Sequence, residues 1–125
     1  MLNQTGITKV SAGTRNTILY DTKLFFALSC KVSDTGVELV NGKKIVKAGT
    51  PLKGSLNDRD TAYAVTSSAD DVIAILEHDV DVTNGAANGS ALFFGFIDQS
   101  KLESDVVSKL TPQIKAAIPT IKFFD

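Results

Sequence analysis

From Val37 onward, short β-prone runs alternate with turn signals, and this pattern restricts the chain to a mainly β fold. Residues 37–40 and 43–46 flank Asn41-Gly42, a pair that tolerates the positive φ angles of a type I′ turn. We therefore expect a hairpin over residues 37–46. Further strands are expected at residues 63–65, 72–82 and 91–97.

The expected strand over residues 72–82 has two different faces. One face holds Ala74, Leu76, His78, Val80 and Val82, and the other holds Glu77, Asp79 and Asp81. Adjacent residues of a strand point to opposite sides. We therefore expect His78 to be a packed, half-buried imidazole, with Glu77 and Asp79 facing water.

Residues 84–90 are rich in Gly, Ala and Asn and predict a flexible loop. This loop leads into residues 91–97, which are so apolar that a buried strand is expected. Alternation along that strand places Phe94 and Phe96 on one face and Phe93 on the other, so we expect these rings to help build the core or a subunit interface.

The apolar period changes from two to nearer 3.6 after this strand, which indicates helix. The helical stripe consists of Val106, Val107, Leu110, Ile114, Ala117 and Ile118. Because Pro112 would break a continuous helix, we expect two short helices, the second with Thr111 as N-cap and Pro112 at its first position. Pro119 ends the second helix, and residues 121–124 can form a closing strand.

The N-terminal third has a different composition. Residues 1–16 are polar with isolated Ile7 and Val10, which predicts an arm without a core of its own. The apolar runs 18–20 and 24–28 suit strands that pack either on the main body or on a partner. We therefore expect an arm with accessory strands over residues 1–36 and a β-rich domain over residues 37–125. The expected fold is mainly β (α+β), a small barrel or sandwich-like domain.

Composition excludes several classes of protein. Thirteen basic and fourteen acidic side chains leave a net charge of −1, which argues against nucleic-acid binding through a broad basic face. The single Cys30 excludes an intramolecular disulfide framework and a Cys-based zinc site. No signal-peptide pattern opens the sequence, so synthesis in the cytoplasm is expected. The longest apolar run, Leu24 to Leu28, is far shorter than the ~20 residues that span a membrane.

No catalytic set emerges from the residue pattern. His78 is the only histidine, and strand alternation turns it away from Glu77 and Asp79. The run beginning at Asp79 fails as a calcium loop, because its sixth position is Asn84 rather than Gly and its twelfth is Ser90 rather than Glu. Cys30 suits a small core residue. We therefore expect a binding protein without catalytic residues, metal or cofactor. A small enzyme with a site completed between subunits is a third alternative.

Several stretches have a familiar order. These are residues 48–52 (Ala-Gly-Thr-Pro-Leu), 62–64 (Ala-Tyr-Ala), 71–76 (Asp-Val-Ile-Ala-Ile-Leu), 79–83 (Asp-Val-Asp-Val-Thr) and 94–98 (Phe-Gly-Phe-Ile-Asp). Over about residues 37–124 the chain resembles the head decoration proteins of tailed bacteriophages, broadly the lambda type. Residues before Val37 do not share the resemblance, and the longer N-terminal part departs from the compact lambda type.

The resemblance implies a structural virion protein that trimerises, binds the major capsid protein at three-fold positions outside the expanded head, and stabilises the capsid. It implies no cofactor, and an N-terminal segment that orders on the capsid. The exposed arm and loop are the expected capsid contacts, which gives Thr5, Ile7, Val10, Asn84 and Asn88 as candidate binding residues. The alternative is another virion module, a tail-tube or head-fibre base protein, which would form rings or fibres.

Overall fold

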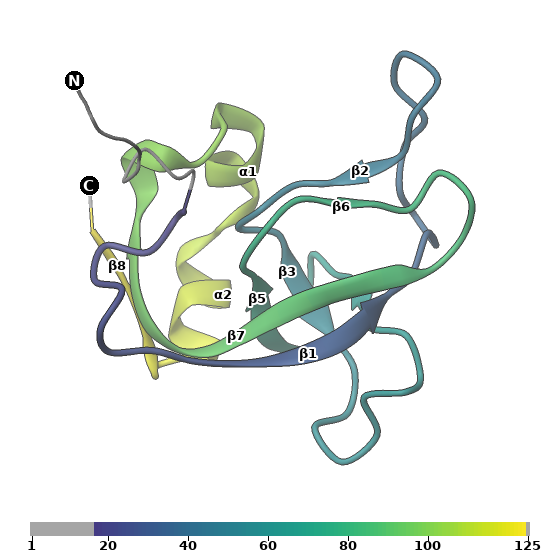
Figure 1. Cartoon of the computed structure of the whole chain (residues 1–125). Coiled ribbons are helices and arrows are strands. Elements are labelled where there is room, and N and C mark those ends of the chain that lie inside the picture. Colours follow the sequence, from purple (N-terminus) through teal and green to yellow (C-terminus); the bar gives the residue numbers. More distant parts are fainter. Residues whose placement is uncertain (1–16, 125) are drawn as a thin grey trace, which may run out of the picture.

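The computed structural model describes residues 17–124, which form a mainly β domain with two short helices near its C-terminal end (Figure 1). The strands are β1 (Phe26–Val32), β2 (Ile45–Val46), β3 (Pro51–Lys53), β4 (Ala64–Val65), β5 (Val72–Leu76), β6 (Val80–Asp81), β7 (Ala87–Asp98) and β8 (Ile121–Phe124). A 3-10 turn, η1 (Gln99–Lys101), and the helices α1 (Ser104–Lys109) and α2 (Pro112–Ala117) lie between β7 and β8. The expected fold class is confirmed.

The main sheet has the order β1-β7-β5-β3-β4, and β8 joins β7 as a parallel neighbour. The two outermost strands of this sheet, β1 and β4, also contact each other. The Tyr63 N–H, just before β4, donates to the Lys31 carbonyl at 2.8 Å, and the Tyr63 carbonyl accepts from the Ser33 N–H at 2.7 Å. This contact joins β4 to the end of β1, so the sheet closes into a small barrel.

The apolar runs before Val37 pack on this body. β1 pairs with β7 along its whole length, from Phe26 opposite Phe94 to Val32 opposite Ala87. The preceding residues 18–20 lie along the end of β7, where the Tyr20 N–H donates to the Phe96 carbonyl at 2.7 Å. Residues 1–16, where the arm is expected, lie outside the described residues.

Two apolar clusters lie on the two sides of the main sheet. The first joins the sheet to the helices and contains Ile18, Leu19, Val72, Ile75, Leu92, Ile97, Leu110, Ile114, Ile118 and Ile121. The second is covered by the small β2–β6 sheet and contains Cys30, Val32, Val46, Leu52, Tyr63, Ala74, Leu76, Val80, Val82 and Ala91. The central strand β5 is therefore buried on both faces, with Ile75 on one side and Ala74 on the other.

The turn at Asn41-Gly42 is confirmed, but the long hairpin around it is wrong. Asn41 and Gly42 have φ angles of 53° and 79°, as a type I′ turn requires, and Val40 and Lys43 exchange backbone hydrogen bonds of 2.8 and 3.0 Å. Pairing stops there, because the following residues 45–46 pair with β6 instead. Pairing with β6 buries Val46 in the second cluster, and this burial is more favourable than a longer hairpin around Asn41-Gly42.

The two C-terminal helices form as expected. The Thr111 hydroxyl accepts a hydrogen bond from the Ile114 N–H at 3.2 Å, and Pro112 occupies the first turn, where a missing N–H costs nothing. Ile114 and Ile118 are buried, whereas Ala117 of the expected stripe is exposed. Among the described helices, none is long and apolar enough to span a membrane.

The expected orientation of residues 77–79 is wrong. β5 ends at Leu76, the chain bends at His78, and pairing resumes only at Val80, so strand alternation is interrupted. Glu77 is buried and His78 is exposed, the reverse of the expectation. The cause is a tertiary contact: Glu77 Oε1 accepts from the Ser90 hydroxyl at 2.7 Å, and the Glu77 N–H donates to the Ser90 carbonyl at 2.9 Å.

The expected loop over residues 84–90 is also shorter in the structure. β7 begins at Ala87, and Asn88, Gly89 and Ser90 already pair with β1. A Cβ built on Gly89 would lie 2.8 Å from Val32 Cγ2. Glycine is therefore placed here because the strand passes close to a buried side chain, and its presence does not indicate a flexible loop.

Candidate functional site

The five residues expected to bind a capsid divide into two groups. Thr5, Ile7 and Val10 lie outside the described residues. Asn84 is exposed in the turn before β7, and Asn88 is exposed within β7, opposite Lys31 of β1. The structure therefore places two of the five on the surface.

The one place where histidine meets carboxylates is a pair of neighbours rather than a catalytic centre. His78 Nε2 lies 3.4 Å from Glu77 Oε2, and the other Glu77 oxygen is held by Ser90. Within residues 17–124, no group of three or more His, Cys, Asp or Glu side chains is placed to hold a metal ion. The buried Glu77 is accounted for by its hydrogen bonds across to β7.

Cys30 is buried in the second apolar cluster. Burial raises the pKa of its thiol, and the nearby Arg59 guanidinium opposes this effect. A raised pKa lowers the fraction of thiolate, the reactive form. The environment of Cys30 is thus that of a packed core residue.

A row of neighbouring aromatic rings lies on the surface of the described part of the chain. We call Tyr20, Phe94, Phe96 and Phe124 the aromatic face. Neighbouring rings follow one another at centroid distances of 5.1 Å (Tyr20 to Phe124), 5.9 Å (Phe124 to Phe96) and 6.4 Å (Phe96 to Phe94). Three of the four are exposed: Tyr20 by 65%, Phe124 by 43% and Phe94 by 39%.

Strand alternation explains why these rings face outward together. β7 runs between residues 18–20 on one side and β8 on the other. The inward residues Ile97 and Ile121 join the first apolar cluster, so the alternate residues on β7 and β8 point away from it. The expectation that residues 91–97 form a wholly buried strand is therefore wrong for Phe94.

The aromatic face is unusual for a molecule that stays alone in water. Of the seven Phe and two Tyr, all within the described part of the chain, only Tyr63 is buried. Soluble monomers seldom expose large contiguous apolar patches, and aromatic side chains are enriched at protein interfaces. The aromatic face is therefore a candidate interaction surface.

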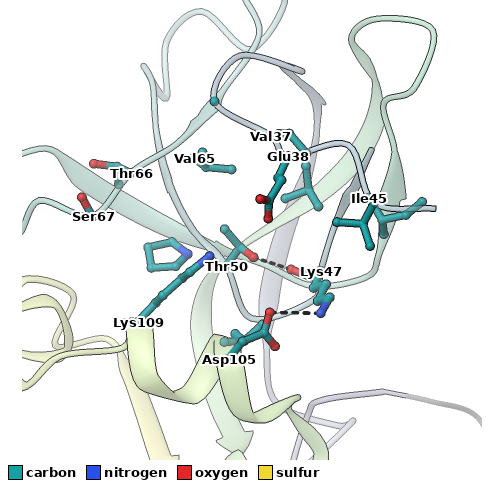
Figure 2. Close-up of a pocket in the computed structure, with 15 residues that line it drawn as sticks. Val37, Glu38, Ile45, Lys47, Thr50, Val65, Thr66, Ser67, Asp105 and Lys109 are labelled. Carbon is teal, nitrogen blue, oxygen red and sulfur yellow. Dashed lines mark hydrogen bonds and ion pairs between the residues drawn. The ribbon is translucent and has the colours of Figure 1, made fainter. Parts of the chain in front are cut away.

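A groove of about 470 Å³ lies elsewhere on the molecule, between the 36–47 segment, the β3–β4 edge and α1 (Figure 2). Its apolar lining is Val37, Val40, Ile45, Val46, Pro51, Val65 and Val106. We call it the α1 groove. The remaining lining is Gly36 and seven polar or charged residues, among them Glu38, Lys47, Asp105 and Lys109, so the α1 groove combines an apolar wall with charged groups.

Charged side chains surround the α1 groove. Lys47 Nζ lies 3.0 Å from both Glu103 and Asp105, and the hydrogen bond that it donates to Asp105 is the main cause that raises the pKa of Lys47. Figure 2 shows the contact between Lys47 and Asp105, and it shows the Glu38 carboxylate, which points into the groove from the opposite wall. Within the described residues Glu38 has no ion-pair partner.

Neither a protein-family model nor a curated protein sequence matches this chain. The candidate surfaces therefore stand on geometry alone. Sequence reasoning placed Phe94 and Phe96 together on one face of a strand, but it did not bring Tyr20 and Phe124 to them, and it missed the α1 groove. For the aromatic face the available signal was Phe94 and Phe96 two residues apart on one strand. For the α1 groove the sequence holds no signal, because its walls come from four separate segments.

Proposed function

We propose that this chain is a structural virion protein that binds the outside of the expanded capsid of a tailed phage as a trimer and stabilises it. The aromatic face carries the proposal, because it is an exposed apolar surface that association with other protein would cover. The order of the strand motifs, which resembles that of lambda-type head decoration proteins, supplies the kind of partner.

The chemistry of the described residues also favours association over catalysis. Its one His–carboxylate contact is a neighbouring pair, and its thiol is buried with a raised pKa. A net charge of −1 suits a protein present in many close copies, since little self-repulsion accumulates.

Binding to purified heads tests this proposal. The neighbouring genes are first searched for a major capsid protein, and heads assembled from that protein are prepared both unexpanded and expanded. We expect the protein to sediment with expanded heads and to raise their melting temperature, because a ligand stabilises the state that it prefers. Equal binding to both shells, or unchanged head melting, would contradict the proposal. Rings larger than trimers, or fibres, would favour a tail-tube or head-fibre base protein.

A further inference from the structure

We propose that copies of this chain associate by inserting the aromatic face of one copy into the α1 groove of the next. This inference rests on the trimer of the proposed function, and it names the two surfaces that would form the contact between copies. It requires no capsid, so it can be tested on the isolated protein.

The symmetry of a trimer requires two different surfaces on each copy. In a closed three-fold ring every contact is heterologous, which means that one surface of a copy meets another surface of its neighbour. A face that stacked on its own counterpart would give a two-fold dimer instead. This chain has such a pair of surfaces, an exposed aromatic row and a groove with an apolar wall.

The two surfaces lie in different parts of the fold. The aromatic face belongs to β7, β8 and residues 18–20, on the side of β7 and β8 that points away from the helical cluster. The α1 groove is lined by the 36–47 segment, residues 50–51, residues 65–67 and α1, and it shares no residue with the aromatic face. A single copy therefore cannot fill its own groove with its own aromatic face.

Shape and polarity also suit this pairing. The groove volume of about 470 Å³ leaves room for a side chain the size of Phe124 or Tyr20. Val40, which is 56% exposed, extends the apolar surface of the groove toward the Asn41-Gly42 turn. Burying rings against this lining would remove apolar surface from water on both copies.

The groove carries a small negative excess, because Glu38, Asp105 and the adjacent Glu103 outnumber Lys47 and Lys109, whereas the aromatic face carries a lysine. Lys122 lies opposite Phe96 in the β7–β8 register, so its exposed side chain stands within the aromatic face. Within the described residues Lys122, like Glu38 in the groove, has no ion-pair partner. Insertion of the aromatic face would bring this lysine toward that carboxylate, which fixes the register of the contact.

The first experiment measures mass by light scattering coupled to size exclusion. The face variant is the double substitution Tyr20→Asp with Phe124→Asp, and the groove variant is Val40→Asp. Each should fall from the mass of three copies to that of one. Leu56→Asp is the matched control, because Leu56 is 52% exposed but belongs to neither surface, and it should remain a trimer. Circular dichroism checks that every variant is folded.

A mixture of the two variants then tests whether the two surfaces bind each other. A face variant keeps an intact groove, and a groove variant keeps an intact face, so the mixture should form a species of two copies. Charge exchange gives a second test: Lys122→Glu and Glu38→Lys should each weaken the trimer, and together they should restore it.

A monomeric wild-type chain would overturn the inference, as would loss of the trimer in only one of the two variants. A mixture that stays monomeric, or a double charge variant that remains weakened, would show that these surfaces do not meet. The proposed function fails separately: a trimer that forms through these surfaces but does not bind expanded heads would contradict the capsid role and leave this inference standing.

Discussion

Replacing Gly89 by alanine is the sharpest test of where β7 begins. The added Cβ would lie 2.8 Å from Val32 Cγ2 and 2.9 Å from Val80 Cγ2. Val32 is fully buried, and Val80 is 6% exposed, so neither side chain has free space to move into. A Gly in a flexible loop would accept the same substitution without a clash.

The expected cost follows from two opposing effects. Overpacking a well-filled core costs about 1–3 kcal/mol. The φ angle of Gly89 lies outside the left-handed region, so alanine can adopt it. Alanine also restricts the unfolded chain, and this effect stabilises the folded state by about 0.4–1 kcal/mol. With the middle value of each range, the net loss of unfolding free energy is about 1.3 kcal/mol, or roughly 5 °C in melting temperature for a domain of this size.

Thermal unfolding followed by circular dichroism measures this change. Wild type and variant are compared at one protein concentration, because association makes the melting temperature depend on concentration. Asn88→Ala is the matched control: the neighbouring side chain is exposed, and it should melt with the wild type. If the melting temperature of Gly89→Ala equals those of the wild type and Asn88→Ala, residues 87–90 do not pack against β1 as described.

Three further predictions concern single contacts. Thr111→Ala removes the cap on the Ile114 N–H and should cost about 0.5–2 kcal/mol in urea unfolding, whereas Thr111→Ser should keep most of it. The hydrogen bond from the Ser100 hydroxyl holds the pKa of Asp98 below its ordinary value. The folding stability that this bond contributes is therefore present above about pH 4 and is lost as the pH falls through the folded pKa. In Ser100→Ala the free energy of unfolding, measured in urea at several pH values, should therefore fall less steeply below pH 4 than in the wild type. An unchanged dependence on pH would refute this assignment. Cys30 should react slowly with a thiol reagent in the folded protein and rapidly in urea, since burial both shields the thiol and raises its pKa; equal rates in the two states would contradict its burial.

Local rules predicted the elements that depend on local chemistry. Asn41-Gly42 forms its turn because few other pairs accept two positive φ angles, and Thr111-Pro112 starts a helix because the cap and the proline ring act on the same turn. These signals lie within a few residues of the structure that they produce. They are therefore readable without knowing the rest of the fold.

The errors all involve partners that are distant in the sequence. Glu77 is buried because the Ser90 hydroxyl, on another strand, donates a hydrogen bond to its carboxylate. No sequence pattern around residue 77 predicts that contact. Gly89 looked like a loop residue because the reason for a glycine there, the approach of Val32, comes from β1. In both cases tertiary packing overrode the interpretation that the local sequence favoured.

The exposure of the aromatic face also depends on elements that are distant in the sequence. Alternation placed Phe94 and Phe96 on one side of a strand, but exposure depends on what covers that side, and the helices cover the opposite one. The rings therefore remain outside, although their composition predicts a core. Because exposed aromatic surface is costly in water, covering it by association would lower the free energy of the assembled protein. A ring of copies would cover three such faces by repeating a single contact, and each copy would then be held by two neighbours at once.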